Sequence, residues 1–326
     1  MNRRAFLGGS LLVLGMPLTS QAQQPLRVWR IGTVLVGSPD AIHPLLPVIE
    51  RSLAASGYVH GRNIVLRQQT APPNPAEVER ILRGVVPNVD LLIAGGTVGG
   101  VAAKKVTTTL PTVFLSVGDP VRVGLVASLA HPGGNMTGIA FEASSETYGK
   151  RLQLLKEIVP GLRVVGVLRA AGDANVINTM ESFERAAPAL NVTLRMFDLN
   201  TAEDVNEAFA VMKRDGVHGV TVIAGAFTFA HSRRIAELAL THRLPSSHAF
   251  RETVIAGGLI SLGPDLVEMS KQAAGLVVRI LRGAHPGDIP VEQPARYEIY
   301  INLKTARALG LSIPQPLLAR ADQVIE

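Results

Sequence analysis

Residues 90–115 read DLLIAGGTVGGVAAKKVTTTLPTVFL, and this stretch contains one complete strand–helix–strand unit. The run Asp90–Ala94 is almost continuously apolar, which is typical of a strand buried on both faces. Gly95-Gly96-Thr97 then forms a turn, and Val98–Val106 has the composition of a helix. Thr112–Leu115 is a second short apolar run and predicts the next strand. Such a unit, with a helix crossing between two strands, is the building block of a parallel α/β sheet.

The same alternation extends in both directions from this unit. Further strands are predicted at Val28–Val36, Asn63–Gln68, Met136–Ile139, Val164–Leu168, Thr193–Asp198, Gly219–Ala224 and Leu259–Leu262. Further helices are predicted at Ile42–Ser56, Pro75–Val85 (with Asn74 as its cap), Ser145–Val159, Val176–Leu190, Ala202–Asp215, Phe229–His242 and Leu266–Arg282. About ten units are too many for one open sheet and divide near Gly138, so we predict two doubly wound parallel-sheet lobes.

Composition excludes several classes of protein. Of the 326 residues, 47% are hydrophobic and 18% are charged, which excludes a disordered chain. Cysteine is absent, which excludes disulfides, cysteine-ligated zinc and thiol catalysis. The net charge of +6 is scattered, without a run of five like charges, and aromatic residues are only 4%. These features argue against a nucleic-acid partner.

The amino terminus predicts export. Arg3 and Arg4 precede the apolar stretch Ala5–Met16, which is too short to span a membrane and resembles the middle of a secretory signal. The small residues in Ser20-Gln21-Ala22 predict cleavage after Ala22, so residues 1–22 form the signal peptide. The paired arginines fit either a twin-arginine signal or the general export route, and an amphipathic or disordered tail is the alternative reading.

Ligands of doubly wound sheets bind beyond the carboxyl ends of the strands. The loops expected at those ends are rich in Gly, Ser and Thr, which allow backbone N–H groups at helix starts to face an anionic group. They are Gly37-Ser38-Pro39, Gly95-Gly96-Thr97, Ser116-Val117-Gly118-Asp119-Pro120, Arg169-Ala170-Ala171-Gly172-Asp173, Gly225-Ala226-Phe227 and Ser246-Ser247-His248.

Several stretches jointly resemble one large bacterial family. They are Gly57-Tyr58-Val59-His60-Gly61-Arg62-Asn63-Ile64, Ala94-Gly95-Gly96-Thr97, Val117-Gly118-Asp119-Pro120-Val121, Pro132-Gly133-Gly134-Asn135-Met136-Thr137-Gly138, Lys150-Arg151-Leu152-Gln153-Leu154-Leu155-Lys156, Arg234-Ile235-Ala236-Glu237-Leu238-Ala239, Ala256-Gly257-Gly258-Leu259 and Ile301-Asn302-Leu303-Lys304-Thr305-Ala306. They occur in the expected order over nearly the whole mature chain. The family that they resemble is the substrate-binding proteins of ABC transporters of the tryptophan/tyrosine-binding type.

This resemblance implies a periplasmic protein of the type I binding-protein fold, with a hinge of several crossings. The first lobe would comprise residues 23–138 and 265–326, and the second residues 139–264. A monomer would clamp a small organic solute, amino-acid-like or other, between the lobes and deliver it to a membrane permease. Two departures concern the ligand. Relatives often carry Trp-Asn-Pro where this chain has Leu168-Arg169-Ala170-Ala171, and an aromatic pair where it has Ser247-His248-Ala249-Phe250.

The loops supply most of the candidate ligand-binding residues, and the resemblance adds Phe250, which with His248 lies where relatives present aromatic residues. Thr97 is also a helix cap, Asp119 a turn residue, and Arg169 a solvated loop residue. One of Phe227 and Phe229 belongs to the core, and Phe227 is the candidate for stacking on a ligand. The candidates are Ser38, Gly96, Thr97, Ser116, Asp119, Arg169, Ala226, Phe227, His248 and Phe250, and the candidate hinge residues are Thr137, Gly138 and Gly263.

Catalytic and cofactor signatures are missing from the sequence. The stretch from Gly95 to Gly100 lacks the spacing of a nucleotide-binding loop, the eight His residues are dispersed, and no nucleophile motif occurs. We therefore expect no cofactor, no metal and no enzyme activity. Glu142 and Glu146 are interpreted as the solvated start of a helix. An exported α/β enzyme and the effector-sensing domain of a regulator remain the alternative functions.

Overall fold

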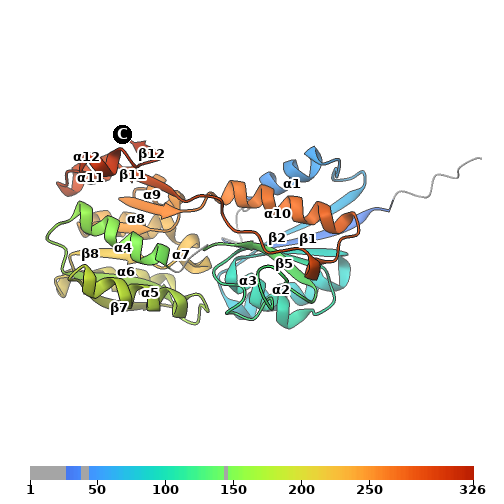
Figure 1. The fold of residues 1–326 in the computed structure, drawn as a ribbon. Coiled ribbons are helices and arrows are strands. Elements are labelled where there is room, and N and C mark those ends of the chain that lie inside the picture. Colours follow the sequence, from blue (N-terminus) through green and yellow to red (C-terminus); the bar gives the residue numbers. More distant parts are fainter. Residues whose placement is uncertain (1–26, 38–43, 143–145) are drawn as a thin grey trace, which may run out of the picture.

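The computed structural model describes residues 27–37, 44–142 and 146–326, which form two α/β lobes lying side by side (Figure 1). The predicted fold class is confirmed, because each lobe is a mainly parallel sheet with helices on both faces. The predicted signal peptide, residues 1–22, and the candidate Ser38 lie outside the described residues.

The first lobe is built on a five-stranded parallel sheet in the order β2-β1-β3-β4-β5. Helices α1 (Leu46–Ala55) and α10 (Leu266–Leu281) pack together on one face, and α2 (Pro75–Val85) and α3 (Gly96–Val106) cover the other. Apolar side chains therefore fill a core on each side of the sheet. Its strands are β1 (Trp29–Val36), β2 (Ile64–Ala71), β3 (Leu91–Gly95), β4 (Thr112–Val117) and β5 (Met136–Ala140).

The second lobe has a seven-stranded sheet in the order β12-β11-β10-β9-β8-β6-β7, in which only β10 and β11 pair antiparallel. Its strands are β6 (Val164–Ala170), β7 (Thr193–Leu199), β8 (Gly219–Val222), β9 (Ser246–His248), β10 (Ile260–Gly263), β11 (Glu298–Asn302) and β12 (Gln323–Ile325). Its helices are α4 (Glu146–Ile158), α5 (Val176–Ala189), α6 (Ala202–Arg214), α7 (Ala226–Ala230), α8 (Ser232–Thr241), α9 (Arg251–Ile255), α11 (Leu303–Leu309) and α12 (Gln315–Leu318).

Local sequence signals explain where several helices begin. The Asn74 side chain accepts hydrogen bonds from the N–H groups of Ala76 and Glu77, so the predicted cap of α2 is formed. Thr201 and Asp204 close a capping box at the start of α6. The single helix predicted from Phe229 to His242 is instead two helices, α7 and α8, which meet at His231.

The chain passes between the lobes three times: after β5, after β10 and before β11. We expected residues 265–326 to belong to the first lobe. That assignment is wrong for residues 298–326, because β11 and β12 extend the second sheet. The chain runs along the edge of the first sheet, where Glu292 pairs with Ile139, before it returns. Strand β11 pairs antiparallel with β10, and the long helix between them, α10, packs on the other lobe. The strand–helix–strand alternation that predicts a parallel sheet is therefore absent here.

Candidate functional site

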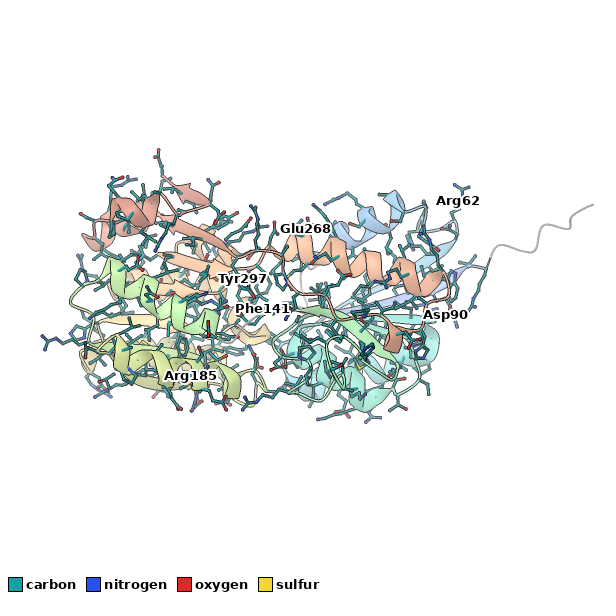
Figure 2. The ribbon with its side chains drawn as sticks, in the orientation of Figure 1. Arg62, Asp90, Phe141, Arg185, Glu268 and Tyr297 are labelled. Atoms are coloured by element: carbon teal, nitrogen blue, oxygen red, sulfur yellow. The ribbon has the colours of Figure 1, made fainter. Side chains whose placement is uncertain are left out.

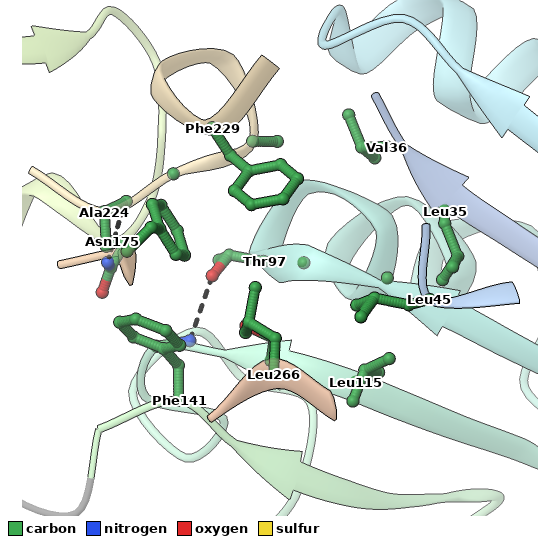
Figure 3. A pocket seen from close by; sticks show the side chains of 17 residues that line it. Leu35, Val36, Leu45, Thr97, Leu115, Phe141, Asn175, Ala224, Phe229 and Leu266 are labelled. Atoms are coloured by element: carbon green, nitrogen blue, oxygen red, sulfur yellow. Dashed lines mark hydrogen bonds between the residues drawn. The ribbon is translucent and has the colours of Figure 1, made fainter. Parts of the chain in front are cut away.

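A pocket lies between the two lobes at the carboxyl ends of their strands, and Figure 3 shows its wall. It encloses about 580 Å³ of free space, part of it open to solvent. Among the described residues that line it, most side chains are apolar and none is charged. A position at the carboxyl ends of the strands, between two lobes, is that of a small-molecule site in this kind of sheet.

The first lobe contributes the turn from β3 into α3. Gly95, Gly96 and Thr97 line the pocket, and Gly96 has a φ of +72°, which an L side chain rarely adopts. The Thr97 hydroxyl does not cap its own helix; it accepts a hydrogen bond of 3.1 Å from the Gly118 N–H and so joins two loops. No side chain caps α3, so its first N–H groups have no side-chain acceptor at the N-cap position.

Ser116 owes its position in the pocket to an irregular backbone. The pairing of β4 with β5 shifts register between Leu115 and Val117, and Ser116 at this bulge has a φ of +65°. A bulge of this kind redirects a strand side chain, here into the pocket lining.

The second lobe contributes Asn175, just before α5. Its Nδ2 donates to the carbonyl oxygen of Ala224 and to the hydroxyl of Tyr148, at 3.0 and 2.9 Å. A carbonyl can only accept, so the amide nitrogen faces Ala224 and the amide oxygen, Oδ1, faces Gly118 of the first lobe. Burial of the Tyr148 side chain raises the pKa of its phenol, which therefore stays protonated.

Asp173 lies directly behind this part of the wall and is only 8% exposed. One carboxylate oxygen accepts the Asn175 N–H at 2.9 Å, and the other, Oδ2, lies against Gly225, where a β-carbon would be only 2.5 Å away. Burial raises the pKa of the Asp173 carboxyl, and none of the described residues forms an ion pair with it.

Three phenylalanines form the aromatic part of the wall. The Phe250 ring lies 4.9 Å from the Phe229 ring and 5.4 Å from the Phe141 ring, both centroid to centroid. All three line the pocket, with Phe141 and Phe229 on opposite sides of it in Figure 3. Aliphatic side chains of the first lobe complete the wall: Leu35, Val36, Leu45, Leu115 and Leu266.

The lobes touch across the pocket, so this is a closed arrangement. A β-carbon on Gly118 would lie 2.5 Å from Asn175 Cγ in the other lobe, and one on Gly96 would lie 4.0 Å from Ala226. At the rim, Arg122 forms a bidentate ion pair with Glu181 of α5, with N–O distances of 2.6 and 2.9 Å.

The structure brings half of the candidate ligand-binding residues to this pocket. The five that line it are Gly96, Thr97, Ser116, Ala226 and Phe250. Two other candidates, Phe227 and His248, do not line the pocket. Phe227 packs into the core of the second lobe beside His231, whereas Phe229 reaches the pocket. Residues two apart on a helix face nearly opposite directions, so the roles of this pair are reversed.

His248 is the second of these. We placed it in a loop, but it ends strand β9 and is 1% exposed. Its Nε2 lies 2.8 Å from the Ser246 hydroxyl, and burial lowers the pKa of its ring to about 3, so the ring is neutral.

Asp119 and Arg169 are also absent from the pocket lining. The Asp119 carboxylate accepts the N–H groups of Val121 and Arg122 and so stabilises its own turn. Strand β6 continues two residues beyond the predicted end, so Arg169 is still in the sheet and pairs with Asp198 directly across on β7. This ion pair raises the pKa of Arg169.

The candidate hinge residues lie at or near the crossings. The Thr137 hydroxyl donates to the Ile289 carbonyl oxygen, and Gly138 pairs through its carbonyl oxygen with the Glu292 N–H. Gly263 ends β10 directly before the second crossing. A β-carbon at Gly138 would clash with the Phe114 carbonyl, and one at Gly263 with that of Ala249.

Sequence analysis missed Phe141, Asn175 and the aliphatic part of the wall. Phe141 directly follows β5, at the carboxyl end of an edge strand, and this position was its only signal. Asn175 lies two residues beyond a loop that we had inspected. The interpretation of Glu142 as solvated is wrong, because it is 9% exposed and forms an ion pair with buried Arg151.

The family model of the ABC transporter substrate binding protein matches residues 33–325. The chain belongs to this family. The match covers both lobes and the pocket between them, so this substrate-binding protein is a component of an ABC transporter that binds a small molecule. It favours solute binding over the two alternatives, an exported enzyme and an effector-sensing domain.

Three relatives illustrate the similarity. A tyrosine-binding protein from Clostridioides difficile (strain R20291) is 29% identical over 266 residues, covering 80% of this chain and 75% of the relative. A conserved domain protein from Vibrio cholerae O1 biovar El Tor has a TM-score of 0.84 at 28% identity. The ABC domain from Streptococcus pneumoniae in complex with L-Trp has a TM-score of 0.83 at 24% identity. Both structures cover 91% of this chain, and this chain covers 99% of each.

Two further features of the described residues concern metal binding and membrane insertion. In residues 27–37, 44–142 and 146–326, no three His, Asp or Glu side chains are grouped so as to hold a metal ion. Among the helices of the same residues, none is long and apolar enough to cross a membrane.

Proposed function

We propose that this substrate-binding protein is exported to the periplasm, clamps an α-amino acid with a large apolar or aromatic side chain, and delivers it as a monomer to a membrane permease. The carrying observation is the distribution of polar groups around the pocket. The uncapped start of α3 lies on the first lobe, Asn175 Oδ1 and the Asp173 carboxylate lie on the second, and apolar side chains line most of the pocket between them. A zwitterion with an apolar side chain matches all three.

The first lobe supplies the donors for the carboxylate. The start of α3 carries backbone N–H groups and the positive end of the helix dipole, and Gly95 and Gly96 allow a ligand to approach the backbone closely. The Thr97 hydroxyl accepts from Gly118 and keeps its own proton for donation. These groups favour an anion without any Arg or Lys side chain.

The second lobe supplies the acceptors for the ammonium group. Asn175 Oδ1 is turned towards the first lobe, and the Asp173 carboxylate lies directly behind Asn175 and Gly225. A buried carboxylate without a cationic partner has an unfavourable desolvation cost, and an ammonium group would offset it. Because the two charges of one ligand contact different lobes, the ligand itself favours closure.

The wall selects the side chain. Phe141, Phe229 and Phe250 offer the edges and faces on which an aromatic ring packs, at about 0.5–1.5 kcal/mol per pair beyond simple burial. The tyrosine-binding relative and the L-Trp complex support this ligand class. The basic and apolar amino terminus supports export, by the twin-arginine or the general route.

Calorimetry with defined ligands tests the proposal. We expect L-Trp, L-Tyr, L-Phe or L-Leu to bind, whereas tryptamine, which lacks the carboxylate, and indole-3-propionate, which lacks the ammonium group, bind at least tenfold more weakly. Small-angle scattering should show compaction with the ligand that binds. Binding of the charge-deleted analogues as tight as that of the amino acid would refute the zwitterion assignment.

A matched pair of variants tests the role of Asp173. Asp173→Asn removes the buried charge and should weaken amino-acid binding at least tenfold. Asp198→Asn removes a carboxylate that is engaged outside the pocket with Arg169, and should leave affinity unchanged. Equal affinities of both variants would contradict stabilisation of the ammonium group by the Asp173 charge.

A further inference from the structure

The hinge contains a fully buried arginine. Arg151, on α4, is 0% exposed and lies in the stretch Lys150–Lys156, which sequence analysis singled out without assigning it a role. Its Nε donates to the Leu262 carbonyl oxygen and its Nη2 to Glu142 Oε1, both at 2.7 Å. Its guanidinium carbon lies 4.7 Å from the Tyr148 ring centroid and 6.0 Å from that of Phe141.

The partners of this arginine belong to different crossings between the lobes. Glu142 is in the first crossing, directly after Phe141. Leu262 is the penultimate residue of β10, at the start of the second crossing. Tyr297 is in the third crossing, and its hydroxyl donates to the Phe141 carbonyl oxygen at 3.3 Å. Figure 2 shows Tyr297 and Phe141 close together at the junction of the lobes. All three crossings are thus joined by polar contacts at one place.

Stability alone does not account for a charged pair at this depth. Removing two charges from water costs much of what their attraction returns, and a well-packed apolar pair is often as stable. Here Arg151 Nη1 has no hydrogen-bond partner among the described residues, so the guanidinium is not fully satisfied. What the pair does provide is directional bonding, which fixes one arrangement of the crossings and of the pocket wall at Phe141.

We propose that Arg151 is a positioning residue for solute binding. It holds Phe141 and the three crossings in the arrangement in which the lobes close on the ligand, although it does not itself line the pocket. Loss of Arg151 therefore lowers affinity by loosening the closed geometry, not by removing a ligand contact. The proposal rests on the proposed function in one respect: a bound solute is what stabilises the closed arrangement of the lobes.

The test measures the distance between the lobes separately from affinity. The chain has no cysteine, so spin labels on Val121→Cys and Glu184→Cys, two exposed positions on opposite sides of the Arg122–Glu181 ion pair, report the closure of the lobes. Two variants are compared: Arg151→Met combined with Glu142→Gln, which leaves no charge on this pair, and Arg151→Lys, which keeps the charge without the planar guanidinium that reaches Glu142 and Leu262 together.

In both variants we expect a broadened distance distribution with and without solute. With saturating L-Trp or L-Tyr, whichever binds the unmodified chain, we expect affinity to fall at least tenfold. Wild-type distributions and affinity in a folded double variant would overturn the proposal. If no amino acid binds the unmodified chain, the proposed function fails, whereas the distributions without solute still test Arg151.

A milder variant covers the case in which the first two do not fold. Tyr297→Phe removes only the hydroxyl that donates to the Phe141 carbonyl and leaves the ion pair in place. We expect a two- to fivefold loss of affinity, through faster release, with an unchanged midpoint of thermal unfolding without solute. A lower midpoint with unchanged affinity would assign this cluster a structural role only and would overturn the proposal.

Discussion

A single methyl group at Gly118 should keep the lobes from closing fully. The three atoms nearest to a β-carbon at this position all belong to Asn175, which lies in the other lobe. The distance to Asn175 Cγ would be 2.5 Å, whereas ordinary contacts of a β-carbon lie at 3.4–4 Å. Gly118→Ala therefore requires the lobes to stay about 1 Å further apart at this point, or the Asn175 side chain to leave its two acceptors.

The expected cost follows from this overlap. Overpacking by one methyl costs about 1–3 kcal/mol, which is about 5- to 150-fold in the dissociation constant if the closed state bears all of it. The assay is calorimetric titration with the amino acid that binds the unmodified chain, together with small-angle scattering at saturation. We expect weaker binding and a less compact complex.

Gly84→Ala is the matched control. Gly84 lies on α2 of the same lobe and has no neighbour within 4 Å of its would-be β-carbon. This variant should bind as the unmodified chain does and gain up to about 1 kcal/mol in free energy of unfolding. Unchanged affinity and compaction in folded Gly118→Ala would refute the closed arrangement of the lobes, since the clash exists only there.

Three further predictions concern the rim, the core and the wall. Charge reversal of Arg122 or of Glu181 alone should weaken solute binding about two- to fivefold in low salt, and reversal of both should restore it. Equal affinities of the unmodified chain, the two single variants and the double variant would exclude a contribution of this ion pair to solute binding. Burial lowers the pKa of His248 from the ordinary 6.5 to about 3 in the folded chain. As the pH drops, the ring therefore takes up a proton in the unfolded chain before it does so in the folded chain. The free energy of unfolding falls below pH 6.5 as a result, by about 2 kcal/mol at pH 5. Between pH 7.5 and pH 5, the free energy of unfolding measured in urea should fall by about 2 kcal/mol less in His248→Asn than in the unmodified chain. The same fall in both proteins would contradict a buried neutral ring. Phe229→Ala should weaken binding of aromatic amino acids tenfold or more while Phe227→Ala mainly lowers the unfolding midpoint, and the reverse pattern in titration and melting would contradict their placement.

The sequence by itself determined the two-lobed architecture. Strands buried on both faces, such as Leu91–Gly95, require covering helices on each face of the sheet. The local pattern of apolar residues predicts both the strands and these helices. The loops at the strand ends followed from the same pattern, which is why Gly96, Thr97, Ser116 and Ala226 could be placed where the pocket lies, whereas Phe250 came from the family resemblance. Their position depends on the polarity of a parallel sheet rather than on any long-range contact.

Only the tertiary structure decided which lobe receives the carboxyl terminus and which polar side chains reach the pocket. The pairing of β11 with β10 joins segments almost forty residues apart, and the long helix between them, α10, packs on the other lobe, so local periodicity carries no information on this pairing. Strand β6 extends two residues beyond its predicted end and includes Arg169, and the short strand β9, which we did not predict, includes His248. On α7, Phe229 rather than Phe227 faces the pocket, because residues two apart on a helix point in nearly opposite directions. The contact of Asn175 with Gly118 and the burial of Arg151 among three crossings exist only once the lobes have come together.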